Sequence, residues 1–124
     1  MEKTKETKEI RVYYAHSKKI YNSEREKNEY LFIKNIYPKT LCPNKDIGEL
    51  GSLKPYLDIV KTMDLIIFSE YMNFIGKGVY AEIQTAIINK IPIKLFRNNN
   101  LLNINKLEIN NKNDWAIKFA KVIL

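Results

Sequence analysis

The clearest chemical signal in the chain is the stretch at residues 75–83, Ile-Gly-Lys-Gly-Val-Tyr-Ala-Glu-Ile, in which two glycines and a lysine precede a glutamate. Glycines at the start of a helix let backbone N–H groups approach a ligand, and a helix N-terminus favours an anion such as phosphate. Gly76 and Gly78 would form the cradle, and Lys77 would supply the counter-charge. An ordinary turn before a helix is the alternative, because the dinucleotide and P-loop motifs are incomplete here.

Glu82 is the candidate catalytic residue of this stretch. It falls in the first turn of a helix predicted over residues 79–90, where the helix dipole favours the ionised carboxylate. An ionised carboxylate at the edge of a cleft can attack the anomeric carbon of a sugar, as in retaining glycoside chemistry. The alternative is structural, because glutamate is common in first turns for its interaction with the dipole alone.

Two adjacent tyrosines, Tyr13 and Tyr14, lie near the end of a strand predicted over residues 10–15. Side chains alternate along a strand, so the two rings point to opposite faces of the sheet. One of them could hydrogen-bond a carboxylate or a sugar while the other packs in the core. Packing of both is the alternative interpretation.

Four other polar residues are candidate ligand contacts because of their positions. His16 and Ser17 follow the first predicted strand, Ser69 follows the strand predicted over residues 65–68, and Asp58 lies in a short predicted helix. An exposed loop is the alternative for His16, and a solvated surface is the alternative for Asp58. The chain has a single histidine and a single cysteine, Cys42, so the sequence contains no zinc motif and predicts neither a metal nor a cofactor.

Strands and helices alternate along the chain. Apolar periodicity and turn signals predict strands at residues 10–15, 40–42, 65–68 and 91–96, helices at 23–36, 55–63 and 79–90, an edge strand or hairpin at 101–109, and a last helix at 114–124. This order predicts an α/β three-layer sandwich of the flavodoxin or Rossmann type, with a mainly parallel central sheet and a C-terminal strand and helix. Ligands bind such sheets beyond the carboxyl ends of the strands, where the candidate residues converge.

Length and composition set the remaining expectations. The 124 residues fit one domain over 1–124, with a flexible tail at 1–9. The sequence has neither a membrane span nor a signal peptide, and its single cysteine cannot pair, so we expect a cytoplasmic protein. The net charge of +7 is spread along the chain, which leaves a nucleic-acid-binding module as a minor alternative.

Four short motifs resemble the nucleoside 2-deoxyribosyltransferase-like superfamily over residues 10–96. They are Val-Tyr-Tyr-Ala-His at 12–16, Asp-Leu-Ile-Ile at 64–67, Gly78-x-x-x-Glu82-Ile-x-x-Ala at 78–86, and Ile-Pro-Ile at 91–93. The resemblance implies hydrolysis or transfer at the N-glycosidic bond of a nucleoside or nucleotide, with Glu82 as the nucleophile. It further implies that Tyr13 or Tyr14 orients Glu82 and that residues 76–78 lie near the sugar or its 5′ group. The resemblance also implies that the reaction needs no cofactor and that the protein forms a homo-oligomer.

A second function stays open beside the enzyme. The same pocket could bind a nucleotide without turnover, as in a phage-type protein that sequesters a nucleotide signal. A phage-encoded protein of this kind would act in the cytoplasm of its host.

Overall fold

The central sheet has five strands, four of them parallel. The computed structural model describes residues 9–104, 106–109 and 119–123, with side chains over 9–104. The strands of the sheet are β1 (Arg11–Ala15), β2 (Lys39–Leu41), β3 (Leu65–Ser69), β5 (Ile93–Arg97) and β6 (Asn100–Asn103). Their order is β2-β1-β3-β5-β6, and only β6 runs antiparallel to its neighbour. The predicted α/β architecture with a mainly parallel sheet is therefore confirmed.

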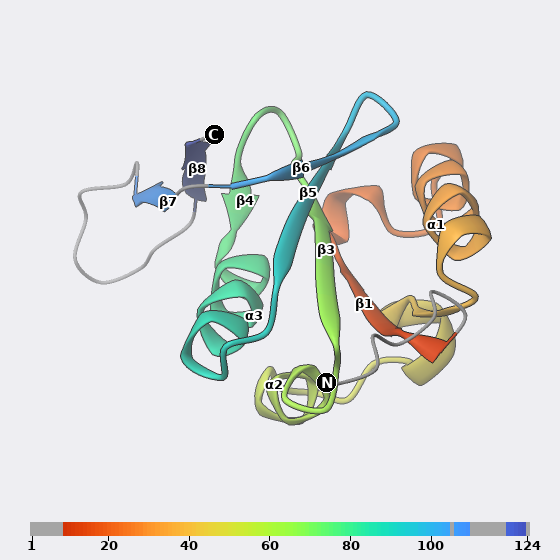
Figure 1. Ribbon diagram of the computed structural model, residues 1–124, viewed down its shortest axis with the longest axis horizontal. Helices are drawn as coiled ribbons and strands as arrows, with labels where there is room; N and C mark the ends of the chain where they lie inside the picture. The colour runs from red at the N-terminus through yellow and green to blue at the C-terminus, as the bar shows by residue number, and fades with distance from the viewer. Residues whose placement is uncertain (1–8, 105, 110–118, 124) are drawn as a thin grey trace, which may run out of the picture.

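Helices cover both faces of this sheet, as Figure 1 shows: α1 (Glu24–Ile36) lies on one side, and α2 (Lys54–Val60) and α3 (Lys77–Ile88) lie on the other. After β1 the chain crosses to β2 at one edge, and it then returns to the other side of β1 to form β3. Right-handed crossovers in opposite directions put their helices on opposite faces. The strand order thus reverses between β1 and β3, and their carboxyl ends form the switch point at which such sheets bind ligands.

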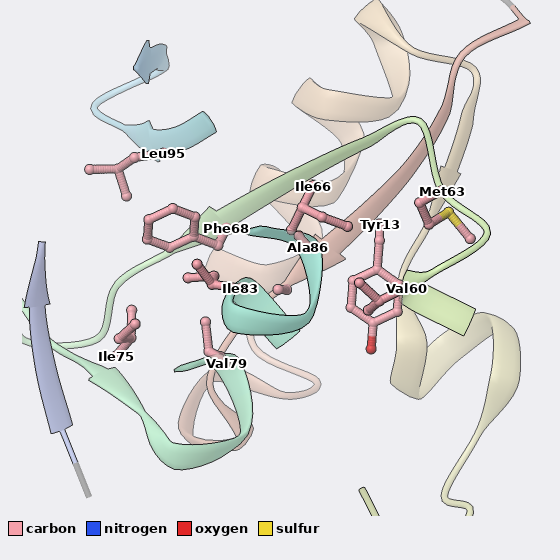
Figure 2. Packing of buried hydrophobic residues seen from close by; sticks show 11 residues of the cluster. Tyr13, Val60, Met63, Ile66, Phe68, Ile75, Val79, Ile83, Ala86 and Leu95 are labelled. Atoms are coloured by element: carbon pink, nitrogen blue, oxygen red, sulfur yellow. The ribbon is translucent and has the colours of Figure 1, made fainter. Parts of the chain in front are cut away.

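Two apolar clusters hold the three layers together. The cluster under α2 and α3 consists of Tyr13, Ala15, Val60, Met63, Ile66, Phe68, Ile75, Val79, Ile83, Ala86 and Leu95, and Figure 2 shows the ring of Tyr13 among these side chains. The cluster under α1 consists of Val12, Tyr14, Ile33, Tyr37, Cys42, Leu65, Ile67 and Phe96. Successive residues of β1 and β3 alternate between the two clusters, and every residue of β3 is buried. This is the pattern of a strand covered on both faces.

A second, antiparallel sheet has the order β4-β8-β7, formed by β4 (Ile75–Gly76), β8 (Phe119–Ile123) and β7 (Lys106–Ile109). The predicted helix at 114–124 is wrong over Phe119–Ile123, while its residues 114–118 and 124 lie outside the described part of the chain. The backbone of β8 pairs with a strand on each side, and two of its five residues, Val122 and Ile123, are β-branched. Pairing and β-propensity therefore outweigh the helical spacing of its apolar residues.

Some element boundaries also differ from those predicted. Helix α3 begins at Lys77, two residues before the predicted start, because Gly76 takes the N-cap position. A 3-10 turn at Lys18–Ile20 and a π-helical turn at Pro43–Ile47 lie outside the predicted helices and strands. Among the described residues, no helix has the length and apolar character needed to cross a bilayer.

The N-terminus of α1 depends on Ser23, whose Oγ accepts a hydrogen bond from the backbone N–H of Glu26 at 3.1 Å. We expect Ser23→Ala to lower the free energy of unfolding by about 1 kcal/mol, because it leaves a helix-end donor without its cap. Urea denaturation measures the difference. Ser52→Ala, in an exposed bend, is the control and should change little. Equal stabilities of the two variants would show that the cap contributes nothing.

Candidate functional site

A tyrosine and a glutamate meet in the interior of the molecule, on the face of the sheet covered by α2 and α3. Tyr13 extends from the middle of β1, and its hydroxyl donates a hydrogen bond to Oε2 of Glu82 on α3. Tyr13 is fully buried and Glu82 is 7% exposed. The two residues are 69 positions apart in the chain, so the fold alone brings them together. This pair is the candidate catalytic centre.

Glu82 has a carboxyl group that is harder to ionise than the sequence predicts. Because α3 begins at Lys77, Glu82 lies in the second turn of the helix, where the dipole effect has largely decayed. Burial raises the pKa of Glu82 to about 7, although the hydrogen bond from Tyr13 acts in the opposite direction. The expectation that the helix dipole keeps this carboxylate ionised is therefore wrong, because desolvation is the larger effect.

Two tyrosines that sequence reasoning did not single out lie close to this pair. Burial, followed by the charge of Glu82, raises the pKa of Tyr21 to about 12. The Tyr56 hydroxyl donates to the carbonyl of Gly48 and accepts the backbone N–H of Leu50 at 3.1 Å. Tyr21 and Tyr56 both add to the electrostatic surroundings that raise the pKa of Tyr13. The sequence held no signal for them, because each is placed by a turn or a short helix.

The glycines before Glu82 do not form the expected loop. Gly76 ends β4 and caps α3 in an extended conformation, with φ −84° and ψ 179°, while Lys77 and Gly78 already belong to the first helical turn. A Cβ added to Gly78 would meet no described atom within 4 Å, so local packing does not require a glycine there. The first backbone N–H groups of a helix lack partners within it, and Gly76 provides no side-chain cap. Lys77 is exposed beside these groups.

Tyr14 belongs to a separate buried pair on the opposite face of the sheet. Its hydroxyl donates to Oε1 of Glu29 at 2.5 Å, and Oε2 of Glu29 accepts a hydrogen bond from Arg25 Nε at 2.8 Å. The two adjacent tyrosines thus point to opposite faces, as their alternation predicts. Tyr13 is the one that contacts Glu82, and Tyr14 contacts Glu29. The only sequence signal for Glu29 is its i,i+4 spacing from Arg25 on a predicted helix.

Glu70, directly after β3, is buried and is contacted by two arginines, one at its carboxylate and one at its backbone carbonyl. Arg97, at the end of β5, donates from Nε at 2.9 Å and from Nη2 at 2.6 Å to Oε1 of Glu70. Arg25 donates to the backbone carbonyl of Glu70. Oε2 of Glu70 is buried and has no hydrogen-bond partner among the described residues. Arg25 links this group to Glu29, because it donates both to Glu29 Oε2 and to the Glu70 carbonyl.

His16 is buried, so its alternative as an exposed loop residue is wrong. Its Nε2 lies 2.6 Å from Oε2 of Glu26, its Nδ1 lies 3.0 Å from the carbonyl oxygen of Tyr14, and its ring stacks on the Tyr14 ring at 3.9 Å. Cys42 completes the group, since one ligand atom from each of His16, Glu26 and Cys42 lies within 4.8 Å of the others. Burial, followed by the charge of Glu26, raises the pKa of the Cys42 thiol to about 12.

The remaining candidate residues are Ser17, Asp58 and Ser69, and the structure gives Ser17 and Asp58 local partners. The Ser17 Oγ accepts the backbone N–H of Lys19 at 3.1 Å and caps the 3-10 turn. Asp58 lies on the exposed side of α2, where its carboxylate pairs with Lys54 at 2.9 Å and Lys61 at 3.6 Å. Ser69 is buried at the end of β3, at the carboxyl edge of the sheet. Asp58 therefore fits its solvated alternative and is held away from the core.

Comparison with protein-family models, with curated proteins and with solved structures finds no match for this chain. Its function is therefore inferred from its own residues and from the contacts they make. The buried Tyr13–Glu82 pair is the contact most specific to chemistry, because it holds an ionisable oxygen in a fixed direction.

Proposed function

We propose that the chain binds a nucleotide and cleaves its N-glycosidic bond, as a hydrolase or a deoxyribosyltransferase, with Glu82 as the nucleophile. The observation that carries this proposal is the hydrogen bond from the Tyr13 hydroxyl to Glu82. A nucleophilic carboxylate needs a fixed orientation and an environment that tunes its pKa, and this pair has both. The same arrangement is what the resemblance to the nucleoside 2-deoxyribosyltransferase-like superfamily implies.

The proposed reaction takes place in two displacements at C1′ of the sugar. The ionised carboxylate of Glu82 forms a bond to C1′ while the bond from C1′ to the base nitrogen breaks, and the electron pair leaves with the base, which takes up a proton. Water or the nitrogen of a second base then attacks C1′ and releases Glu82. Tyr13 donates its hydrogen bond to one carboxylate oxygen and so directs the other toward the sugar. Tyr13 acts as a positioning residue.

Nucleotide binding without turnover is the second candidate, and the burial of Glu82 favours it. The side chain is 7% exposed, its partner Tyr13 is fully buried, and its pKa near 7 leaves much of the carboxyl group protonated at neutral pH. Such a group is a weaker nucleophile than an ordinary ionised glutamate. Under this alternative the protein would sequester a nucleotide signal without cleaving it.

Ligands that carry a phosphate should bind more tightly than those without one. We expect a nucleoside 5′-phosphate to raise the melting temperature more than the matching nucleoside, because a phosphate would interact favourably with Lys77 and with the backbone N–H groups at the start of α3, which Gly76 does not cap with a side chain. A thermal-shift screen over nucleosides, nucleotides and cyclic dinucleotides measures this, and chromatography of each hit detects free base. Free base supports the enzyme, and a shift without free base supports the binder.

A matched pair of lysine variants tests the phosphate contact. Lys77→Gln should reduce the extra shift given by the phosphate, whereas Lys90→Gln, which removes the same charge from an exposed position just beyond the other end of α3, should not. Equal shifts by nucleoside and nucleotide would remove the role proposed for Lys77. The absence of any shift and of any free base would contradict both candidate functions.

A further inference from the structure

His16, Glu26 and Cys42 come from three separate elements and converge on one buried point. His16 follows β1, Glu26 lies in the first turn of α1, and Cys42 follows β2. All three are buried, and one ligand atom of each, nitrogen, oxygen and sulfur, lies within 4.8 Å of the other two. Sequence spacing could not reveal this group, because a zinc motif is recognised by closely spaced cysteines and histidines.

The contacts of His16 bring its Nε2 and a Glu26 carboxylate oxygen close together in this group. A neutral imidazole has one N–H, and the carbonyl oxygen of Tyr14, 3.0 Å from Nδ1, can only accept it. The lone pair of Nε2 then faces Oε2 of Glu26 at 2.6 Å, where two acceptors would oppose each other. A hydrogen-bond proton can fill the position between these two atoms, and so can a metal ion.

We propose that His16 Nε2, Glu26 Oε2 and Cys42 Sγ form a zinc-binding site. Imidazole nitrogen, carboxylate oxygen and thiolate sulfur are the three donor types that Zn²⁺ takes from proteins, and three protein ligands leave its fourth position for water or another oxygen. Asn44 Oδ1, 3.3 Å from Cys42 Sγ, brings such an oxygen to the same group. The proposal is independent of the function proposed for Glu82.

The surroundings of the three ligands are those of a metal site. The Tyr14 carbonyl accepts the N–H of Nδ1, and this contact fixes the tautomer in which Nε2 is free to bind a metal. A backbone carbonyl is a usual hydrogen-bond partner for the second nitrogen of a metal-binding histidine. Oε1 of Glu26 is already engaged, since it accepts the backbone N–H of Asn22 at 3.0 Å and lies 3.6 Å from Lys45 Nζ. These contacts turn Oε2 toward His16 and Cys42.

Metal entry requires a small rearrangement and releases protons. Ligands at tetrahedral zinc lie about 3.3–3.8 Å apart, so His16 and Glu26 must separate slightly from their 2.6 Å contact. Zn²⁺ replaces the proton between those two side chains and the thiol proton of Cys42, and both protons leave to solvent. The thiolate and the carboxylate then balance the charge of the ion, and the site joins the ends of β1 and β2 to the start of α1.

The test is metal binding by the untagged, full-length chain, which holds only one histidine and one cysteine. Equilibrium dialysis with ZnCl₂ should give one Zn²⁺ per chain, and Co²⁺ in its place should give a thiolate-to-metal charge-transfer band. His16→Gln, Glu26→Gln and Cys42→Ser should each weaken zinc binding at least tenfold, and Cys42→Ser should remove the band. Glu29→Gln, on the same helix and also buried, is the matched control and should bind zinc normally.

Several outcomes would overturn the site. Zinc that fails to bind at micromolar concentration would mean that a proton alone holds His16 to Glu26. Zinc binding that persists in His16→Gln and Cys42→Ser would place the metal elsewhere on the chain. Circular dichroism of each variant at the binding temperature separates a lost ligand from a lost fold, and Cys42→Ser keeps nearly the same side-chain volume for this reason. The cobalt band is lost only if sulfur is a ligand.

Discussion

Replacing Glu82 with glutamine is expected to abolish base release from a nucleoside 5′-phosphate while nucleotide binding persists. The amide is nearly isosteric, and its carbonyl oxygen can still accept the hydrogen bond from Tyr13. An amide cannot form the glycosyl intermediate, so the rate should fall on the order of 10⁴-fold or more, as for other catalytic nucleophiles. Chromatography under single-turnover conditions measures the rate, and the thermal shift with the same nucleotide measures binding.

Glu29→Gln is a matched control for this substitution. It makes the same chemical change in the other buried tyrosine–glutamate pair, that of Tyr14, on the opposite face of the sheet. The proposal expects the control to keep its activity, so a loss confined to Glu82→Gln identifies the nucleophile. Undiminished activity in Glu82→Gln would exclude Glu82 as the nucleophile. A wild-type protein that binds nucleotides without releasing base would leave the non-catalytic binder as its function.

The layered architecture could be predicted because burial on both faces leaves a direct pattern in the sequence. The apolar run at residues 65–68 is the central strand β3, and Ser23 caps α1 as its sequence pattern predicts. Strand β8 could not be predicted in the same way. Its pairing partners, β4 and β7, are set by long-range contacts, and its apolar residues have a spacing that also fits a helix.

The sequence identified Glu82 and the two tyrosines as candidates, but it did not show which tyrosine contacts Glu82. Alternation put Tyr13 and Tyr14 on opposite faces, yet the choice between them depends on which helix covers each face. The protonation of Glu82 was predicted in the wrong direction, because the true start of α3 and the depth of burial follow from packing. The convergence of His16, Glu26 and Cys42 left no local pattern at all.

Wild-type stability should fall as the pH rises from 4.5 to 7, relative to a variant without the Glu82 carboxyl group. The pKa of Glu82 is about 7 in the folded state, against an ordinary value of 4.5 for an exposed glutamate. Between these values the folded chain keeps a proton that the unfolded chain has lost, so the free energy of unfolding decreases with pH. The shift corresponds to about 3 kcal/mol, most of it lost by pH 7.

Urea denaturation of wild type and Glu82→Gln between pH 4 and 8 measures this dependence. Groups that both proteins share titrate alike, so their contributions cancel in the difference. The free energy of unfolding of Glu82→Gln minus that of the wild type should therefore increase by about 3 kcal/mol from pH 4 to pH 8. A difference that stays constant with pH would show that Glu82 ionises normally. The same ionisation that weakens the fold supplies the nucleophile, so base release should increase through pH 7 as wild-type stability declines. Opposite pH trends of activity and stability, both removed by one substitution, would assign them to this single carboxyl group.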